Sequence, residues 1–209
     1  MLKIIAIALT LLSGCSFGSG NLQSKRSLDL ESRRIRRIAV LPPETSGAPE
    51  QAQSQQNNPP EMLAKQLYSA MASSPNWQIV AESEVNQVEQ MKASTSDAAR
   101  LRQIGEMVFA DAVMVGRVLR FRERIGDDWG VKSPASVAFV LDLIDVRRGD
   151  VIWSARFDET QQALSENIFG LGNIGQRGVR WLTAEQLAMD GVKKAVGQLH
   201  QILVRSGAS

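Results

Sequence analysis

The chain has a single cysteine, Cys15, and a single histidine, His200, in 209 residues. One cysteine cannot form a disulfide within the chain, and one cysteine with one histidine gives too few ligands for a zinc site of the usual cysteine and histidine type. The formal net charge is only +2, so no strong field is present to attract a nucleic acid. Beyond residues 4–12, no apolar run approaches the roughly 20 residues of a membrane-spanning helix. The sequence therefore predicts neither a metal site nor a nucleic-acid partner.

The amino terminus has the order of a cleaved export signal. Lys3 supplies a positive charge, residues 4–12 are apolar, and a small-residue cleavage site ends at Cys15. The sequence LSGC at 12–15 resembles the lipobox of bacterial lipoproteins. This resemblance implies that the signal peptide 1–14 is removed, with diacylglycerol on the sulfur of Cys15 and an acyl chain on its nitrogen. An ordinary signal peptide with an incidental cysteine is the alternative.

The same resemblance implies a place in the cell. Each buried methylene contributes about 0.8 kcal/mol, so three acyl chains would hold the protein on a membrane. Ser16, rather than an aspartate, follows the cysteine. By resemblance to Gram-negative sorting rules, this favours the outer membrane, with the protein facing the periplasm. No cofactor other than the covalent lipid is expected.

Residues 15–34 are expected to be the lipidated cysteine and a flexible tether, because the segment is polar and has few large apolar residues. Arginines stand at 33, 34, 36 and 37. They either contact anionic headgroups, at about 1 kcal/mol each, or form a solvated lead-in to the first strand. The folded domain is expected over 35–206, with a mobile loop at 44–60, which is rich in Gln, Asn, Ser and Pro.

Hydrophobic periodicity predicts alternating strands and helices in this domain. Strands are expected at 37–41, 77–80, 112–121, 136–145 and 151–160, with Trp77 and Trp153 in the core. Helices are expected over 61–72, from Ser83, from Ser96 and from Thr183, which forms a capping box with Gln186. The predicted fold is an α/β single-domain sandwich. Its mixed sheet of about five strands ends in an antiparallel meander and is packed by helices, including a long C-terminal helix.

Three segments carry a resemblance to known families: RIAVLPP at 37–43, IGEMVFADAVMVGRV at 104–118 and LDLIDVRRGDVIWSARF at 141–157. Together with the lipobox, they resemble the families built on the amino-terminal domain type of TolB, including CsgG, PelC and LpoB-type activators. The resemblance implies a noncatalytic envelope protein that assembles with copies of itself or with a partner. Residues 122–134 depart from the curli channel CsgG, because they are too short and charged for membrane-crossing hairpins.

An interaction surface is predicted where the meander leaves one end of the sheet. The loop 122–134 and the segment 161–181 depart from the same end of an antiparallel meander. They carry the apolar residues Trp129, Ile168, Phe169, Leu171, Ile174 and Trp181, and a polar rim of Arg124, Arg177 and Arg180. These side chains either contact a neighbouring subunit, a partner or the bilayer interface, or fold back as a satellite core.

Other patterns suggest chemistry less specifically. Residues 170–175 match the glycine pattern of dinucleotide-binding loops, but no strand leads directly into them. His200 is expected at a surface or edge position, and the aspartates near Gly149 in a turn. The leading hypothesis is an assembly or secretion accessory lipoprotein that is not an enzyme. The alternatives are a monomeric adaptor that activates a cell-wall synthesis enzyme, and a nucleotide or small-molecule binder that uses residues 170–175.

Overall fold

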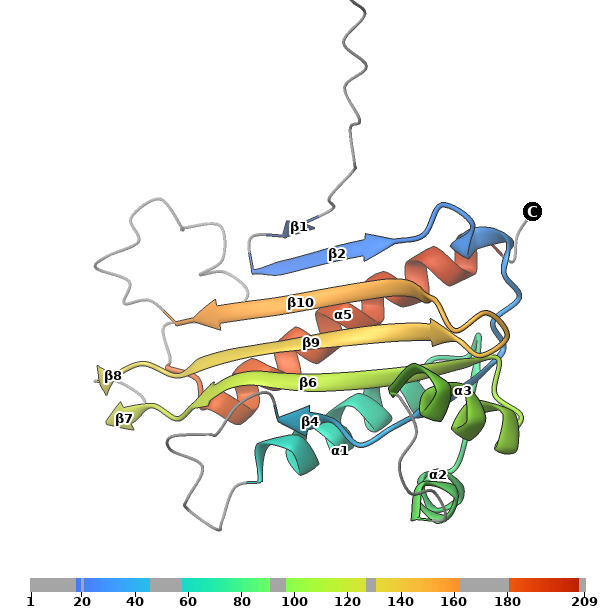
Figure 1. The fold of residues 1–209 in the computed structure, drawn as a ribbon. Helices are drawn as coiled ribbons and strands as arrows, with labels where there is room; N and C mark the ends of the chain where they lie inside the picture. The colour runs from blue at the N-terminus through green and yellow to red at the C-terminus, as the bar shows by residue number, and fades with distance from the viewer. Residues whose placement is uncertain are drawn as a thin grey trace, which may run out of the picture.

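The computed structural model describes residues 18–19, 21–45, 58–90, 97–126, 131–161 and 181–206, and has a mixed sheet with helices packed on it (Figure 1). The eight-stranded sheet has the order β1-β2-β10-β9-β6-β3-β5, and β4 pairs with β6 off this path. A separate two-stranded sheet joins β7 (Ile125–Gly126) to β8 (Val131–Ser133). The α/β class is confirmed, and the sheet contains all five expected strands and three more.

The antiparallel meander forms the centre of the sheet. Its strands are β6 (Ala112–Arg122), β9 (Ser136–Asp145) and β10 (Val151–Thr160), close to the predicted ranges. Gly149 has a φ of 75° and donates its N–H to the carbonyl of Asp145 at 2.7 Å. Because that φ favours glycine, Gly149 allows the tight connection between β9 and β10.

The remaining predicted strands add a parallel part to the sheet. Strand β3 (Arg37–Val40) lies between β6 and β5 (Gln78–Ile79) and is parallel to both. The short strand β4 (Glu44–Thr45) also pairs parallel with β6. Glu44 and Thr45 therefore belong to the sheet rather than to the loop expected at 44–60, and residues 46–57 lie outside the described residues.

The prediction of a flexible tether through residue 34 was wrong for its second half. Strand β2 (Leu22–Arg26) pairs with β10, and β1 (Gly18–Ser19) pairs with β2. The 3-10 helix η1 (Leu30–Ser32) follows, and Leu22 and Leu30 are both fully buried. Two leucines and backbone pairing with β10 are enough to fix this segment, although its composition is polar.

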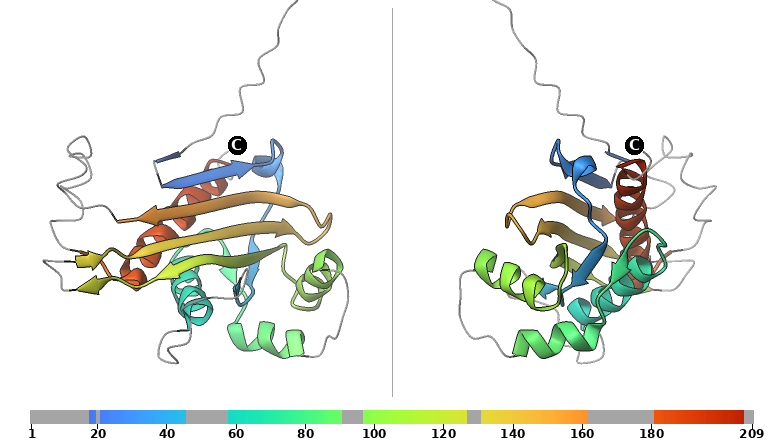
Figure 2. Two further views of the ribbon diagram at one scale, coloured as in Figure 1. Left: turned by 60° about the vertical axis from the view of Figure 1, so that its left-hand side comes forward. Right: turned by 90° about the vertical axis from the view of Figure 1, so that its right-hand side faces the viewer.

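Helices cover the two faces of the sheet unequally (Figure 2). Helices α1 (Pro59–Ala72) and α5 (Ala184–Ser206) pack against one face, with β9, β10 and β6. Helices α2 (Glu82–Gln90) and α3 (Asp97–Met107) pack on the other face, over β3 and the start of β6. Helix α2 was expected to begin with Ser83 as its cap, but it begins at Glu82, and the carbonyl of Ala81 accepts the first helical N–H groups. In the described part of the chain, no helix is long and apolar enough to cross a membrane.

The larger core lies between the sheet and the α1–α5 layer. Trp77 and Trp153 are 7% and 1% exposed, which confirms their predicted core positions. Helix α5 packs against the sheet at Gly191, where a Cβ atom would lie 2.7 Å from the ring of Phe157. A glycine is needed there because a larger residue would force the helix and the sheet apart.

Candidate functional site

Residues 122–124, 161 and 181–186 form the capping end, which is one end of the sheet. The carboxylate of Glu123 accepts the N–H of Ala184, with distances of 3.1 and 3.2 Å to its two oxygens. Nη1 of Arg124 donates to the carbonyl of Trp181 at 3.1 Å. The structure thus brings the segment after β6 to the start of α5, as the strand order predicted for Arg124 and Trp181.

Most of the predicted interaction surface lies outside the described residues. These are Trp129, Ile168, Phe169, Leu171, Ile174, Arg177 and Arg180, together with the glycine-rich segment 170–175. Trp181 is described and is partly buried. A contact role for these side chains therefore stays a prediction.

The capping end also holds the predicted capping box. The N–H of Gln186 donates to Thr183 Oγ1 at 3.2 Å, and the N–H of Thr183 donates to Gln186 Oε1 at 3.1 Å. Gln161 Oε1 accepts the N–H of Leu182 at 2.8 Å. The bond to Thr183 Oγ1 satisfies a backbone N–H group that the first turn of α5 leaves free, and the other two satisfy N–H groups just before the helix. The capping end is therefore held by hydrogen bonds to the backbone.

Residues 28–36, 106–111 and 145–151 form the arginine end, which is the opposite end of the sheet. Arg33 lies at its centre, with a side chain 9% exposed, and its guanidinium contacts three carboxylates. The distances are 2.8 Å to Asp145 Oδ2, 2.7 Å to Asp29 Oδ2, and 2.9 Å to each oxygen of Asp150. Asp145 also accepts the N–H groups of Arg147 and Arg148 through Oδ1. This cluster joins η1 to the turn between β9 and β10.

The charges in this cluster stabilise one another. The hydrogen bonds from Arg33 hold the pKa of Asp29 and of Asp150 below its usual range. In turn, the hydrogen bond to Asp150 raises the pKa of Arg33, despite the opposing effect of burial. Asp29, Asp150 and Arg33 are therefore charged at neutral pH, and the carboxylates in this turn serve an ion cluster in addition to the turn itself.

The arginines at 33, 34, 36 and 37 have two different environments. Arg33 is in the buried cluster, and Arg37 donates to the carbonyl of Val108 at 3.2 Å and pairs with Glu84 at 3.4 Å. Arg34 and Arg36 have exposed side chains. Neither alternative offered for the four arginines, headgroup contact or a solvated lead-in, holds for Arg33 and Arg37, whose guanidinium groups bind within the domain.

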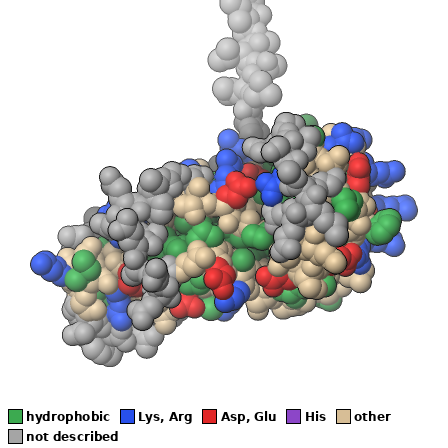
Figure 3. Space-filling view, turned by 60° about the horizontal axis from the view of Figure 1, so that its bottom comes forward, with side chains coloured by type: hydrophobic (Ala, Val, Ile, Leu, Met, Phe, Trp, Pro, Cys, Tyr) green, Lys and Arg blue, Asp and Glu red, His purple; other side chains and the backbone are tan. Residues whose placement is uncertain are grey.

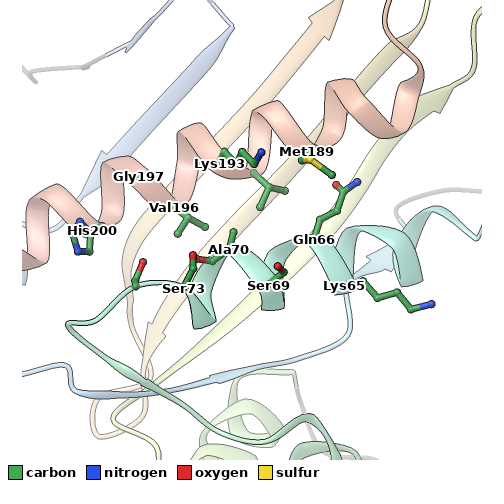
Figure 4. Close-up of a pocket in the computed structure, with 12 residues that line it drawn as sticks. Lys65, Gln66, Ser69, Ala70, Ser73, Met189, Lys193, Val196, Gly197 and His200 are labelled. Atoms are coloured by element: carbon green, nitrogen blue, oxygen red, sulfur yellow. The ribbon is translucent and has the colours of Figure 1, made fainter.

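A groove of about 520 Å³ runs between α1 and α5 on the outer side of the helical layer (Figure 4). It is lined by Lys65, Gln66, Ser69, Ala70, Ser73, Ser74, Met189, Val192, Lys193, Val196, Gly197 and His200. A Cβ atom added at Gly197 would meet nothing within 4 Å, so this wall is open. Sequence reasoning missed the groove, although small residues at 69, 70 and 73 were its signal.

His200 lies where the groove ends, near the loop that follows α1. Its Nε2 atom is 2.8 Å from the amide nitrogen of Asn76. Its ring meets the ring of Trp77 edge-on, with the two centroids 5.7 Å apart. These contacts give His200 a packing role between α5 and the segment after α1, at the edge position that the sequence predicted.

No protein-family model matches the sequence, and no curated protein matches it. Among solved structures, the fold is similar to a substituted PelC dodecamer from Paraburkholderia phytofirmans. The TM-score is 0.52 at 15% identity, over 86% of this chain and 98% of that chain. This similarity shows that the chain has a PelC-like fold.

Two further solved structures are more distant. The C-terminal domain of LpoB from Salmonella enterica gives a TM-score of 0.41 at 17% identity, over 60% of this chain and 83% of that chain. A lipoprotein from Neisseria meningitidis gives 0.41 at 16% identity, over 68% and 98%.

Proposed function

We propose that this protein is a noncatalytic lipoprotein of the bacterial outer membrane that faces the periplasm. The observation that carries the proposal is the position of its sole cysteine. Cys15 ends an apolar export signal and stands only three residues before the first strand. An acylated sulfur at this point attaches the whole domain to a lipid leaflet.

The domain acts as an assembly or secretion accessory by binding other protein chains, and self-association is the first mode that we propose. The support is by analogy, because the PelC structure that shares this fold is a dodecamer. The α1–α5 groove supports protein contact by its chemistry. Its walls combine apolar Met189 and Val196 with hydrogen-bonding Ser69 and Ser73, a mixture that suits side chains of another protein.

Two measurements test the lipid anchor. Intact mass spectrometry of the protein purified in detergent is expected to show loss of residues 1–14 and gain of three acyl chains. Cys15→Ser is expected to remove the lipid and to release the domain from the membrane fraction. A mature wild-type protein with a free thiol at Cys15, washed from membranes by salt, would contradict the anchor.

Light scattering of the unlipidated domain tests self-association. A defined oligomer supports the proposal, whereas a monomer at all concentrations supports the adaptor alternative. Gly197→Trp then tests the groove, because the added ring fills open space rather than displacing core atoms. It is expected to weaken self-association at least tenfold. Gln201→Trp, exposed on the same helix, is the matched control.

A further inference from the structure

The end of α3 presents two large apolar side chains to solvent. Residues 106–111, within which α3 ends, form the α3 tip. Phe109 is 83% exposed and Met107 is 42% exposed, and the two lie two positions apart. Figure 3 shows hydrophobic side chains among charged ones at the right-hand end of the molecule, where Figure 1 places α3. The α3 tip is therefore an apolar projection that its own domain leaves uncovered.

Backbone hydrogen bonds hold the ring of Phe109 on a fixed turn. The N–H of Phe109 donates to the carbonyl of Glu106 at 3.2 Å, and the N–H of Ala110 donates to the carbonyl of Gly105 at 2.8 Å. These bonds end α3 with Phe109 in the left-handed conformation, at a φ of 53°, a position that glycine usually takes. Because the backbone is already ordered, burial of this ring against another molecule has a small entropic cost.

The α1–α5 groove has the size and the lining to accept such a projection. Its volume of about 520 Å³ lies within the roughly 300–1,000 Å³ of pockets that hold small ligands. Met189, Val192 and Val196 supply an apolar wall, and Met189 is itself 38% exposed. Gly197 leaves another part of the wall open. An aromatic ring can therefore enter the groove without displacing core atoms.

The charges of the two surfaces are complementary. Of the twelve described residues that line the groove, Lys65 and Lys193 are cations and none is a carboxylate. The α3 tip has the opposite composition, because its six residues include Glu106 and Asp111 and no cation. Opposite charges at the rim favour this pair of surfaces over contact between two like surfaces.

Ion pairs within one copy do not prevent this match. Lys65 pairs with Glu61, and Glu106 pairs with Arg102 at 3.6 Å. Each of these four side chains is at least 45% exposed. Exposed pairs of this kind contribute little to stability, so their members can change partners at an interface.

The α3 tip and the groove belong to opposite faces of the sheet (Figure 2). Helix α3 packs over β3 and the start of β6, whereas α1 and α5 pack on the other face. The folded sheet therefore separates the tip from the groove of its own chain. A copy that donates its tip to a second copy keeps its own groove free for a third, which is the property of a heterologous contact.

We propose that the α3 tip of one copy binds in the α1–α5 groove of a second copy. This proposal rests on the self-association proposed above and names the surface that fills the groove. Phe109 and Met107 pack against the apolar wall of the groove, and Glu106 lies toward Lys193. The same two surfaces then repeat from copy to copy.

Phe109→Gly tests the tip, because it removes the ring and leaves a residue suited to the left-handed position. In sedimentation velocity of the full-length protein in mild detergent, it is expected to raise the dissociation constant of self-association at least tenfold. Met107→Ser, which does not alter that turn, is expected to raise it several-fold. Ile125→Ser is the matched control, since Ile125 is also an exposed apolar residue but lies beyond the other end of β6. It is expected to change nothing, and thermal unfolding checks that each variant folds.

A mixture of two variants distinguishes this contact from a symmetric one. Phe109→Gly keeps an intact groove, and Gly197→Trp keeps an intact tip. Each is expected to associate weakly alone, whereas an equimolar mixture is expected to form a one-to-one dimer and no larger species. The reason is that only one tip and one groove in each pair of copies can still bind. A contact between two grooves predicts no such dimer.

The outcomes separate this proposal from self-association itself. If wild type forms an oligomer and both tip variants associate as tightly as wild type, the tip is not the occupant and self-association stands. A mixture that forms no dimer also overturns the proposal. A wild-type protein that is monomeric at all concentrations overturns both.

Discussion

The two ends of the sheet are held by different kinds of interaction. At the arginine end, the guanidinium of Arg33 joins carboxylates from η1, β9 and the following turn. At the capping end, Glu123 and the Thr183–Gln186 box accept or donate hydrogen bonds at the start of one helix. Removing one buried charge leaves the opposite charges beside it buried without a counter-ion. Removing one capping side chain leaves only a backbone N–H group without its acceptor, and water can reach that group. The arginine end should therefore depend far more on a single side chain.

Arg33→Met is expected to have the largest effect. It removes the cation from a cluster in which Asp145 has a side chain only 8% exposed. Asp145 keeps its two turn N–H donors, so the expected loss in free energy of unfolding is about 3 kcal/mol, at the low end for a broken buried pair. Urea denaturation monitored by tryptophan fluorescence measures this loss.

Arg34→Met is the matched control for that variant. Arg34 is the next residue and has an exposed side chain, so its replacement is expected to change stability by no more than about 0.5 kcal/mol. Equal losses for the two substitutions would show that the cluster contributes nothing and would remove the contrast between the two ends.

Acid is expected to weaken the arginine end selectively. Arg33 holds the pKa of Asp29 and of Asp150 below its usual range. A lowered carboxylate pKa stabilises the fold above the unfolded-state pKa of about 3.9, and this contribution is lost as pH falls through the lower native pKa. The difference in free energy of unfolding between wild type and Arg33→Met should therefore have its largest value near neutral pH and should decrease below about pH 4.

The capping end supplies the control for the acid experiment. Thr183 and Gln186 do not ionise in this range, so the cost of Thr183→Ala should stay constant over the same pH series. A stability difference for Arg33→Met that is constant down to pH 2 would contradict the assigned role of the carboxylates.

Thr183→Ala itself is expected to have an intermediate effect. It removes the Oγ1 acceptor for the N–H of Gln186 and leaves the other half of the capping box in place. The expected loss is about 1 kcal/mol, typical of an N-cap threonine. Thermal unfolding compared with Gln201→Ala, exposed on the same helix, isolates the cap. A loss as large as that of Arg33→Met would reverse the comparison of the two ends.

The central fold was predictable because each of its elements has a recognisable pattern in the local sequence. The strands 136–145 and 151–160 are apolar runs separated by a glycine turn, and the structure places them within those bounds. Thr183 and Gln186 stand at the spacing of a capping box, and both expected hydrogen bonds form. Strand β2 was missed because it contributes a single buried leucine. Its other support is backbone pairing with β10, which leaves no pattern in the sequence.

The candidate surfaces were less predictable for a similar reason. The strand order correctly indicated that Arg124 and Trp181 meet, since an antiparallel meander determines which segments share an end. The cluster around Arg33 joins residues more than 110 positions apart in sequence, so no local spacing reveals it. Asp29 and Arg33, four residues apart, were its one local signal. The exposure of Phe109 depends on a backbone angle at the end of α3.

Substitutions at Phe109 are expected to have the smallest effect on the free energy of unfolding. They show whether this residue of the arginine end can be replaced without loss of stability. Phe109→Ala removes the ring but keeps an L residue at a φ of 53°, whereas Phe109→Gly also relieves the backbone. The left-handed region costs L residues roughly 1–2 kcal/mol, and the greater freedom of glycine in the unfolded chain offsets part of this. The glycine variant should therefore be more stable than the alanine variant by about 0.5–1 kcal/mol, and no less stable than wild type, in parallel urea denaturations. A glycine variant as strongly destabilised as Arg33→Met would show that the exposed ring supports the fold, and the arginine end would then be structural throughout.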